Sequence, residues 1–224
     1  HRRYHFDATW AVMAHSAGVP AALFKLMHPR IPMLLTLQEG DSPAHIERTM
    51  LPLWPLFSRA FMHANAVQAI STFLAEWARR RGAIAPIEVI PNGVDVVHFA
   101  HTSTSQERAV VRVQLGAKPD ETWLIHTGRF VAKNGLDTVV RALPLLPEKI
   151  HFFAIGDGPG RGTLEDLAQE LGVSGRVHLH PYVPLTELPT YLHACNIFVR
   201  PSRSEGMGNS FIEAMARRVP VIAT

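Results

Sequence analysis

The sequence predicts an α/β protein whose strands run parallel in open sheets. From residue 122 onward, short apolar runs rich in β-branched residues alternate with longer amphipathic segments, which is typical of strand, helix and strand. Hydrophobic residues make up 47% of the chain and charged residues 18%, as in ordinary globular proteins. At about 150 residues per domain, 224 residues suffice for one large core, or for one domain and part of another.

The second half of the chain is expected to alternate regularly between strands and helices. Each helical stretch is opened or closed by Gly, Pro, Ser or Asn, which start and stop helices. Strands joined through helices run parallel, and ligands bind at the carboxyl ends of such strands. The expected strands are 123–126, 150–155, 177–180, 197–199 and 219–223, and the expected helices are 135–146, 162–171, 185–194 and 210–218.

The first half has a less regular pattern. Its expected elements are helices at 18–27, 46–64 and 72–81, and strands at 33–37 and 87–90. Residues 90–95, IPNGVD, predict a turn, because proline fixes φ and Asn-Gly tolerates left-handed geometry. We interpret residues 91–120 as the passage between two domains, which gives domains of 1–100 and 101–224.

Composition and charge exclude several classes of protein. Lys and Arg number 22 against 19 Asp and Glu, and they form no basic stripe of the kind that binds a nucleic-acid duplex. The single cysteine, Cys195, cannot form a disulfide within the chain. The chain opens without an apolar signal core and nowhere approaches about 18 uninterrupted apolar residues. We expect a cytoplasmic protein with no nucleic-acid partner and no membrane span.

Familiar cofactor and metal motifs are missing from the sequence. The glycine-rich run 156–162 departs from a dinucleotide fingerprint, since Arg161 stands where the third glycine belongs. No Walker loop, nucleophile elbow or Asp-x-Asp pair occurs. His178 and His180 alternate along a predicted strand without further ligands at metal-binding spacing. The sequence therefore predicts no metal and no cofactor, and any phosphate would be bound by amides, helix termini and basic side chains.

The segment 202–218, SRSEGMGNSFIEAMARR, offers such groups. It places a glycine-containing loop between a predicted strand and a predicted helix, where free backbone amides stabilise an anion. Glu205 in the loop and Glu213 in the helix can face the same crevice, and carboxylates accept hydrogen bonds from sugar hydroxyls. A structural alternative stays open for Glu213, because Ser210 and Glu213 fit the capping-box pattern.

Several segments resemble one known family in the same order along the chain. Glu205 and Glu213 have the E-x7-E spacing of the retaining glycosyltransferases of family four, which have the GT-B fold. Four more segments are similar to segments of this family: VIPNGVD at 89–95, TGR followed by KNGLD at 127–137, FAIGDGP at 153–159 and RRVPVIAT at 217–224. The resemblance extends from residue 7 to the last residue and implies a GT-B fold, with two Rossmann-like domains built on parallel sheets.

The resemblance implies a role for each matching residue. Arg129 and Lys133 would neutralise the diphosphate of a nucleotide-sugar donor, because fixed positive groups stabilise the charge that the leaving nucleoside diphosphate gains. Glu205 would hold hydroxyls of the donor sugar, and Glu213 the ribose. The family needs no metal ion, and same-face attack gives retention without a covalent protein nucleophile. The backbone amides expected to hold the phosphates are those of Gly206, Met207, Gly208, Asn209 and Ser210.

Two positions depart from the family pattern. Gln38 stands where the family commonly has a histidine, and a glutamine cannot act as a titrating acid or base. His15 is therefore considered with Gln38 as an acceptor-side residue, although a lone histidine near a helix start is more often structural. Lys133 lies one position earlier than the usual lysine, which directly precedes the glycine, and Asn134 holds that place.

The resemblance also predicts that both domains are incomplete. The first strand and glycine-rich loop of a GT-B protein would precede His1, and a glycine-rich loop and the closing helices would follow Thr224. A partial domain leaves apolar faces without a partner sheet. We expect the intact protein, rather than this fragment, to be active.

The expected activity is transfer of a sugar from a nucleoside-diphosphate sugar to a saccharide or lipid-linked acceptor. Two alternatives are kept: a GT-B-like epimerase that converts the donor without an acceptor, and a non-catalytic nucleotide-sugar-binding protein. The arginines 79–81, on a helix with Phe73, Leu74 and Trp77, allow peripheral contact with the inner face of an anionic membrane. Such a cluster is more often a solvated face.

Overall fold

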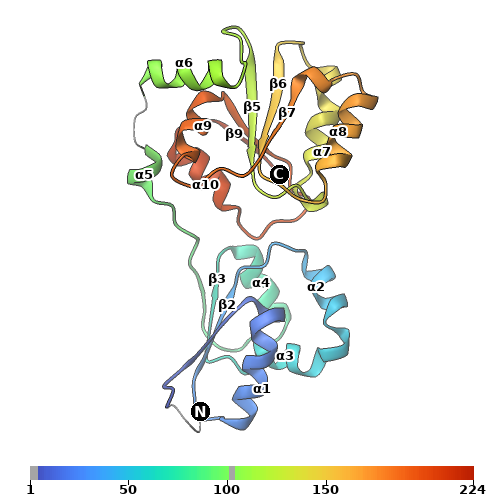
Figure 1. The fold of residues 1–224 in the computed structure, drawn as a ribbon. Helices are drawn as coiled ribbons and strands as arrows, with labels where there is room; N and C mark the ends of the chain where they lie inside the picture. Colours follow the sequence, from blue (N-terminus) through green and yellow to red (C-terminus); the bar gives the residue numbers. More distant parts are fainter. Residues whose placement is uncertain (1–4, 101–103) are drawn as a thin grey trace. The chain divides into compact units, whose positions relative to one another are not determined.

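The chain divides into two compact units (Figure 1). A computed structural model describes residues 5–100 and 104–224. The first unit holds His1–Asn92 together with Ser204–Gly208, and the second holds Gly93–Arg203 and Asn209–Thr224. The domain boundary predicted after residue 100 adjoins residues 101–103, which lie outside the described residues.

The first unit contains a parallel sheet in the order β1-β2-β3-β4. The predicted strand at 33–37 is confirmed with the same bounds, whereas β1 and β3 were not predicted. The strands are β1 (Thr9–Val12), β2 (Met33–Leu37), β3 (Ala66–Ala69) and β4 (Ile87–Val89). The helices are α1 (Val19–Met27), α2 (Pro43–Thr49), α3 (Trp54–Met62) and α4 (Thr72–Arg80), with a π-helical turn at Met13–Gly18 and a 3₁₀ turn at Leu51–Leu53.

The prediction of one helix over 46–64 is wrong, because prolines divide this segment. Pro52 lies at the start of the 3₁₀ turn and Pro55 at the start of α3. Proline has no backbone N–H and disfavours helical geometry at the residue before it, so it starts a helix but does not continue one. The segment therefore folds as α2 and α3, with a turn between them.

The helix α4 turns two of its apolar side chains into the core of the first unit. Leu74 and Trp77 are buried, and the indole N–H of Trp77 donates to Glu47 at 2.8 Å. Phe73 is exposed. The guanidinium of Arg81 lies 3.5 Å from the Glu47 carboxylate. Of the three apolar residues considered for membrane contact, only Phe73 is therefore on the surface.

The second unit contains a parallel sheet in the order β7-β6-β5-β8-β9. All of its predicted strands are present, and β6 and β7 have the predicted bounds. The strands are β5 (Thr122–Thr127), β6 (Ile150–Ile155), β7 (Val177–His180), β8 (Ile197–Arg200) and β9 (Val221–Ala223). The helices are α5 (Val96–Ala100), α6 (Ser105–Gln114), α7 (Leu136–Ala142), α8 (Arg161–Glu170), α9 (Leu188–Ala194) and α10 (Asn209–Ala216).

Both faces of this sheet are covered by helices. Side chains alternate along each strand, so Leu124 of β5 packs in a cluster with α7 and α8, while its neighbour Ile125 packs with α9 and α10. Figure 1 shows α7 and α8 on one face and α9 and α10 on the other. Such burial on two faces explains the nearly continuous apolar character of these strands.

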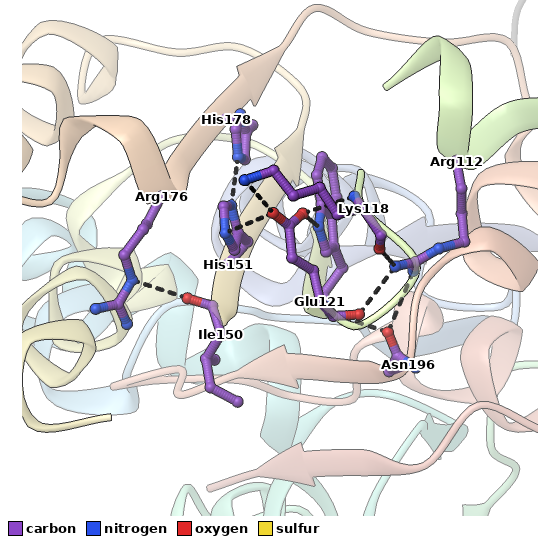
Figure 2. A network of polar contacts seen from close by, with 9 residues as sticks. Arg112, Lys118, Glu121, Ile150, His151, Arg176, His178 and Asn196 are labelled. Atoms are coloured by element: carbon purple, nitrogen blue, oxygen red, sulfur yellow. Dashed lines mark hydrogen bonds and ion pairs between the residues drawn. The ribbon is translucent and has the colours of Figure 1, made fainter. Parts of the chain in front are cut away.

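A polar network closes the amino ends of β5, β6 and β7 (Figure 2). Glu121 accepts hydrogen bonds from the backbone N–H of Lys118 at 2.9 Å and from the indole N–H of Trp123 at 3.0 Å. Its carboxylate also lies 3.5 Å from His151, whose Nδ1 is 3.0 Å from Nε2 of His178. Because parallel strands start at one edge, this network fastens the edge opposite to the carboxyl ends.

Candidate functional site

The strand order of the second unit creates a switch point between β5 and β8. The chain passes from β5 outward to β6 and β7, then returns to form β8 on the other side of β5. Connections leave adjacent strands on opposite faces at such a point, so the carboxyl ends border a crevice where α/β proteins bind ligands. Here Gly128 and Arg129 follow β5, and Arg200 ends β8.

Glycines let the loops at these carboxyl ends approach each other closely. Gly135 has φ +69°, and a Cβ placed on it would lie 2.0 Å from the carbonyl oxygen of Pro201, after β8. Gly156, after β6, has φ +143°, and its Cβ would lie 2.0 Å from the carbonyl oxygen of Gly128. Only glycine satisfies both the dihedral angle and the space. The loops after β5, β6 and β8 are thus in backbone contact.

Arg129 presents an exposed side chain directly after β5. Among the residues that the structure describes, no hydrogen bond or ion pair holds its guanidinium. Its backbone carbonyl accepts a hydrogen bond from the side-chain amide of Asn134 at 2.6 Å. The backbone of Arg129 is therefore fixed, while its cation faces solvent at the switch point.

Lys133 and Asn134 have different environments within one short 3₁₀ turn, Ala132–Asn134. Lys133 is half-buried, and its carbonyl accepts from the backbone N–H of Arg203 at 2.7 Å. Asn134 is buried, with 3% of its surface exposed, and its carbonyl oxygen accepts from Arg200 at 3.3 Å. The side chain of Asn134, directly before Gly135, therefore points inward, toward β8.

The start of α10 brings Ser210 to the same edge. Helix α10 begins at Asn209, so Ser210 lies inside the helix and cannot be its N-cap; the capping-box alternative for Glu213 is wrong. The hydroxyl of Ser210 instead accepts from Arg200 at 2.7 Å. Glu213 is half-buried, and burial raises the pKa of its carboxyl while the positive charge of Arg200 opposes this rise.

The predicted loop residues 204–208 are grouped with the first unit. Met207 packs against the core of that unit, and Glu205 and Gly206 are half-buried. A Cβ on Gly206 would lie 2.1 Å from the carbonyl oxygen of Glu39, so this position requires glycine. The expectation that Glu205 and Glu213 face one crevice stays a prediction, as do the roles of the backbone amides from Gly206 to Ser210.

On the first unit, the carboxyl ends of β1 and β2 hold the predicted His15 and Gln38. Gln38 is exposed, whereas the next residue, Glu39, is buried with 1% of its surface exposed. Nδ1 of His15 lies 4.0 Å from Oε1 of Glu39, and that carboxyl also accepts from the backbone N–H of Ala14. The π-helical turn begins at Met13 with φ +73°, a strained value for this residue type, and π-helical turns are frequent at functional sites.

Two charged residues of these edges, Glu39 and Arg200, were not among the predicted site residues. Glu39 stands two residues after β2, in LLTLQE, and Arg200 is the last residue of β8, in IFVR. A charged residue at the carboxyl end of a buried parallel strand is the signal that identifies them.

Neither a metal-binding cluster nor a membrane-spanning helix occurs within the described residues. Within residues 5–100 and 104–224, His, Cys, Asp and Glu form no group of three or more that could hold a metal ion. In the same residues, none of the helices has the length and apolar character needed to cross a bilayer.

Family profiles match both halves of the chain. A profile described as "Glycosyl transferases group 1" matches residues 107–224, and one described as "Glycosyltransferase Family 4" matches residues 2–98.

Curated relatives include bacterial glycosyltransferases. The chain is 32% identical over 218 residues to the putative teichuronic acid biosynthesis glycosyltransferase TuaC of Bacillus subtilis, covering 97% of this chain and 53% of that protein. It is 33% identical over 169 residues to a GDP-mannose-dependent α-(1-6)-phosphatidylinositol monomannoside mannosyltransferase of Mycolicibacterium smegmatis, covering 69% of this chain and 44% of the relative. The chain thus spans about half the length of these relatives.

Solved structures share the fold. HepE of Anabaena, in complex with UDP and glucose, matches with a TM-score of 0.83 at 24% identity, covering 97% of this chain and 59% of that chain. Sucrose-phosphate synthase from Thermosynechococcus elongatus matches with a TM-score of 0.82 at 24% identity, covering 100% of this chain and 57% of that chain. Two parallel sheets, these structural matches and the two profiles together confirm the resemblance: the chain belongs to glycosyltransferase family four and has the GT-B fold.

Proposed function

We propose that the intact protein is a retaining glycosyltransferase that moves a sugar from a nucleoside-diphosphate sugar to a saccharide or lipid-linked acceptor without a metal ion. The observation that carries the proposal is the switch point of the second unit. There an exposed arginine, Arg129, follows β5 at the same sheet edge where α10 begins. Cations and helix amino ends are the groups that bind a diphosphate.

The proposed chemistry needs positive charge rather than a protein nucleophile. When the bond between the sugar C1 and the diphosphate oxygen breaks, the electron pair remains on the leaving nucleoside diphosphate. The acceptor oxygen bonds to C1 from the same face, and its proton passes to the leaving diphosphate. Arg129 and Lys133 stabilise the developing charge, and Glu205 orients the donor sugar through its hydroxyls. Glu213 holds the ribose.

We assign the donor to the second unit and the acceptor to the first. The second unit has the complete switch point, and it holds all the residues matched by the profile for glycosyl transferases group 1 except 204–208. In the first unit, β1 and β2 end close in sequence to His15 and Gln38, and we propose this region as the acceptor side. The exposed Phe73, Arg79 and Arg80 of α4 are consistent with a lipid-linked acceptor at a membrane surface, which stays part of this proposal.

Calorimetric binding to the full-length protein tests the donor assignment. UDP-glucose and GDP-mannose are the first probes, because relatives are named for or solved with these nucleotides. Arg129→Ala and Glu213→Ala are expected to weaken donor binding at least tenfold, which is about 1.4 kcal/mol. Arg141→Ala and Glu170→Ala are matched controls, since both residues are exposed on α7 and α8.

The outcomes separate the candidate functions. Binding of one donor that both site variants weaken and both controls preserve supports the proposal. No binding of any nucleotide sugar by a folded full-length protein excludes it. Conversion of the donor in the absence of acceptor identifies an epimerase instead, and binding without any turnover identifies a non-catalytic binding protein.

A further inference from the structure

Arg200 is the last residue of β8, and its side chain lies at the centre of the switch point. An arginine here is unusual for its surroundings, because the preceding residues, Phe198 and Val199, are buried core residues. The sheet therefore ends in a charged side chain at the edge where ligands bind. The side chain is half-buried, so its charge acts through a medium less polar than water.

Three segments hold the Arg200 guanidinium in place. Nη1 donates to the Ser210 hydroxyl at 2.7 Å, Nε to the Ser202 hydroxyl at 3.0 Å, and Nη2 to the Asn134 side-chain oxygen at 3.3 Å. The group also lies 5.5 Å from the ring centre of Phe211 on α10. The acceptors of these three bonds are neutral groups, two hydroxyls and one amide oxygen, and the Arg200 charge also acts on the half-buried Glu213 carboxyl.

The charge of Arg200 lies close to the end of β5 as well as to the start of α10. A Cβ on Gly128, after β5, would lie 3.9 Å from Nη1 of Arg200, so the guanidinium borders the loop that carries Arg129. Burial lowers the pKa of His126 to about 3, and the positive charge of Arg200 adds to this effect. The positive charge of Arg200 therefore lies beside Ser210 of α10 and close to His126 near the end of β5.

The contact between Arg200 and Asn134 indicates a role for the positive charge of Arg200. Asn134 occupies the position directly before Gly135, where the family resemblance expects a lysine, and its side chain is a neutral amide buried against Arg200. We propose that Arg200 is a catalytic residue that binds the diphosphate of the nucleotide donor, supplying from the end of β8 the positive charge that Asn134 lacks. This inference rests on the proposed function. Arginine suits the role, because its planar group forms paired hydrogen bonds with phosphate oxygens.

A charge-relocation experiment tests the assignment on the full-length protein. The probes are UDP and GDP, measured by calorimetry, with the initial transfer or donor-hydrolysis rate as a second readout. Arg200→Gln keeps hydrogen-bond donors for Ser210 and Ser202 but removes the charge, and it is expected to weaken binding at least tenfold. Arg200→Lys keeps the charge but loses the paired hydrogen bonds, so its affinity is expected to fall between those of Arg200→Gln and the wild type. Circular dichroism checks that each variant is folded.

The decisive variant combines Arg200→Gln with Asn134→Lys. If Arg200 acts through its charge on the diphosphate, the lysine before Gly135 restores most of the lost affinity. If Arg200 only holds Asn134 and Ser210 in place, the second substitution removes one more of its partners and affinity stays low or falls, which overturns the proposal. Wild-type affinity in Arg200→Gln overturns it as well. Failure of the wild-type protein to bind any nucleoside diphosphate instead removes the proposed function itself.

Discussion

Glu39 shows how a single buried carboxyl links stability to pH. It has 1% of its surface exposed at the end of β2, and one carboxyl oxygen accepts from the backbone N–H of Ala14. Burial raises the pKa of Glu39, because the charged form loses its hydration, and the Ala14 hydrogen bond opposes the rise only in part. Because the native pKa of Glu39 is raised, its protonated side chain contributes to stability below pH 4.5, the pKa of the carboxyl in the unfolded chain. This contribution is lost as the pH rises through the native pKa.

Replacement of this carboxyl should therefore stabilise the protein in a pH-dependent way. Glu39→Gln keeps an oxygen for the Ala14 N–H and cannot ionise, so it is expected to raise the free energy of unfolding at pH 7 by about 1 kcal/mol or more. The gain should be much smaller at pH 4. Urea unfolding at both pH values measures it, with Glu76→Gln on the exposed side of α4 as control. An equal effect at the two pH values contradicts the explanation.

Cys195 is expected to be chemically inert in the native protein. Its side chain is buried, and burial raises the pKa of the thiol to about 12, so almost no thiolate exists at pH 8. A thiol reagent such as dithionitrobenzoate should modify the native chain only at the rate of opening or unfolding. In denaturant it should titrate one thiol per chain. Fast modification of the folded protein contradicts this burial.

At the scale of elements, the loop packing of the switch point depends on glycines that have no tolerance for a side chain. Gly135→Ala would force a left-handed φ on alanine and place its Cβ 2.0 Å from the Pro201 carbonyl oxygen. We expect a loss of at least about 2 kcal/mol in the free energy of unfolding. Gly162→Ala is the matched control, because it lies in α8 with nothing within 4 Å of its Cβ and should be neutral or stabilising. Similar losses in both variants would falsify the role of backbone contact at Gly135.

Elements with strong apolar runs could be predicted from the sequence, and elements defined by other signals could not. The strand at Ile150–Ile155 reads IHFFAI and was predicted with its observed bounds. The strand β3 reads AVQA, which is too short and too rich in alanine to stand out. Helix α6 lies inside the segment interpreted as a passage, although Thr104 and Glu107 form a capping box that marks its start.

The positions of several candidate residues could be predicted where one segment carries the pattern. Arg129 follows β5, Ser210 lies near the start of α10 and Glu213 lies inside α10, all as expected, while their roles stay predictions. The inward direction of Asn134 depends on Arg200, a residue 66 positions away. A contact of this kind is set by the strand order, which pairs β5 directly with β8, and no local pattern contains it.

For the whole molecule, four histidines with lowered pKa values are expected to make stability fall in acid. Burial is the main cause that lowers the pKa of His126, His151, His178 and His193 below the ordinary value of 6.5. The unfolded chain therefore binds more protons than the native chain as pH falls below this value. The stability that these neutral histidines contribute is complete above pH 6.5 and is lost toward the native pKa values.

The largest single part of this acid sensitivity is expected from His126, which has 0% of its surface exposed and a native pKa of about 3. Between pH 7.5 and 5, one proton taken up only by the unfolded state lowers the free energy of unfolding by about 2 kcal/mol. His126→Asn should remove this part of the pH dependence even if it destabilises the protein at pH 7.5. Ile125→Val, its neighbour on β5, should lower stability by about 1 kcal/mol at every pH and leave the slope intact. Urea unfolding followed by circular dichroism at pH 7.5, 6.5 and 5 measures how the free energy of unfolding of each variant depends on pH. Asparagine stays neutral in the folded and the unfolded state, so it cannot couple folding to proton binding. An unchanged pH dependence in His126→Asn would therefore show that another group titrates.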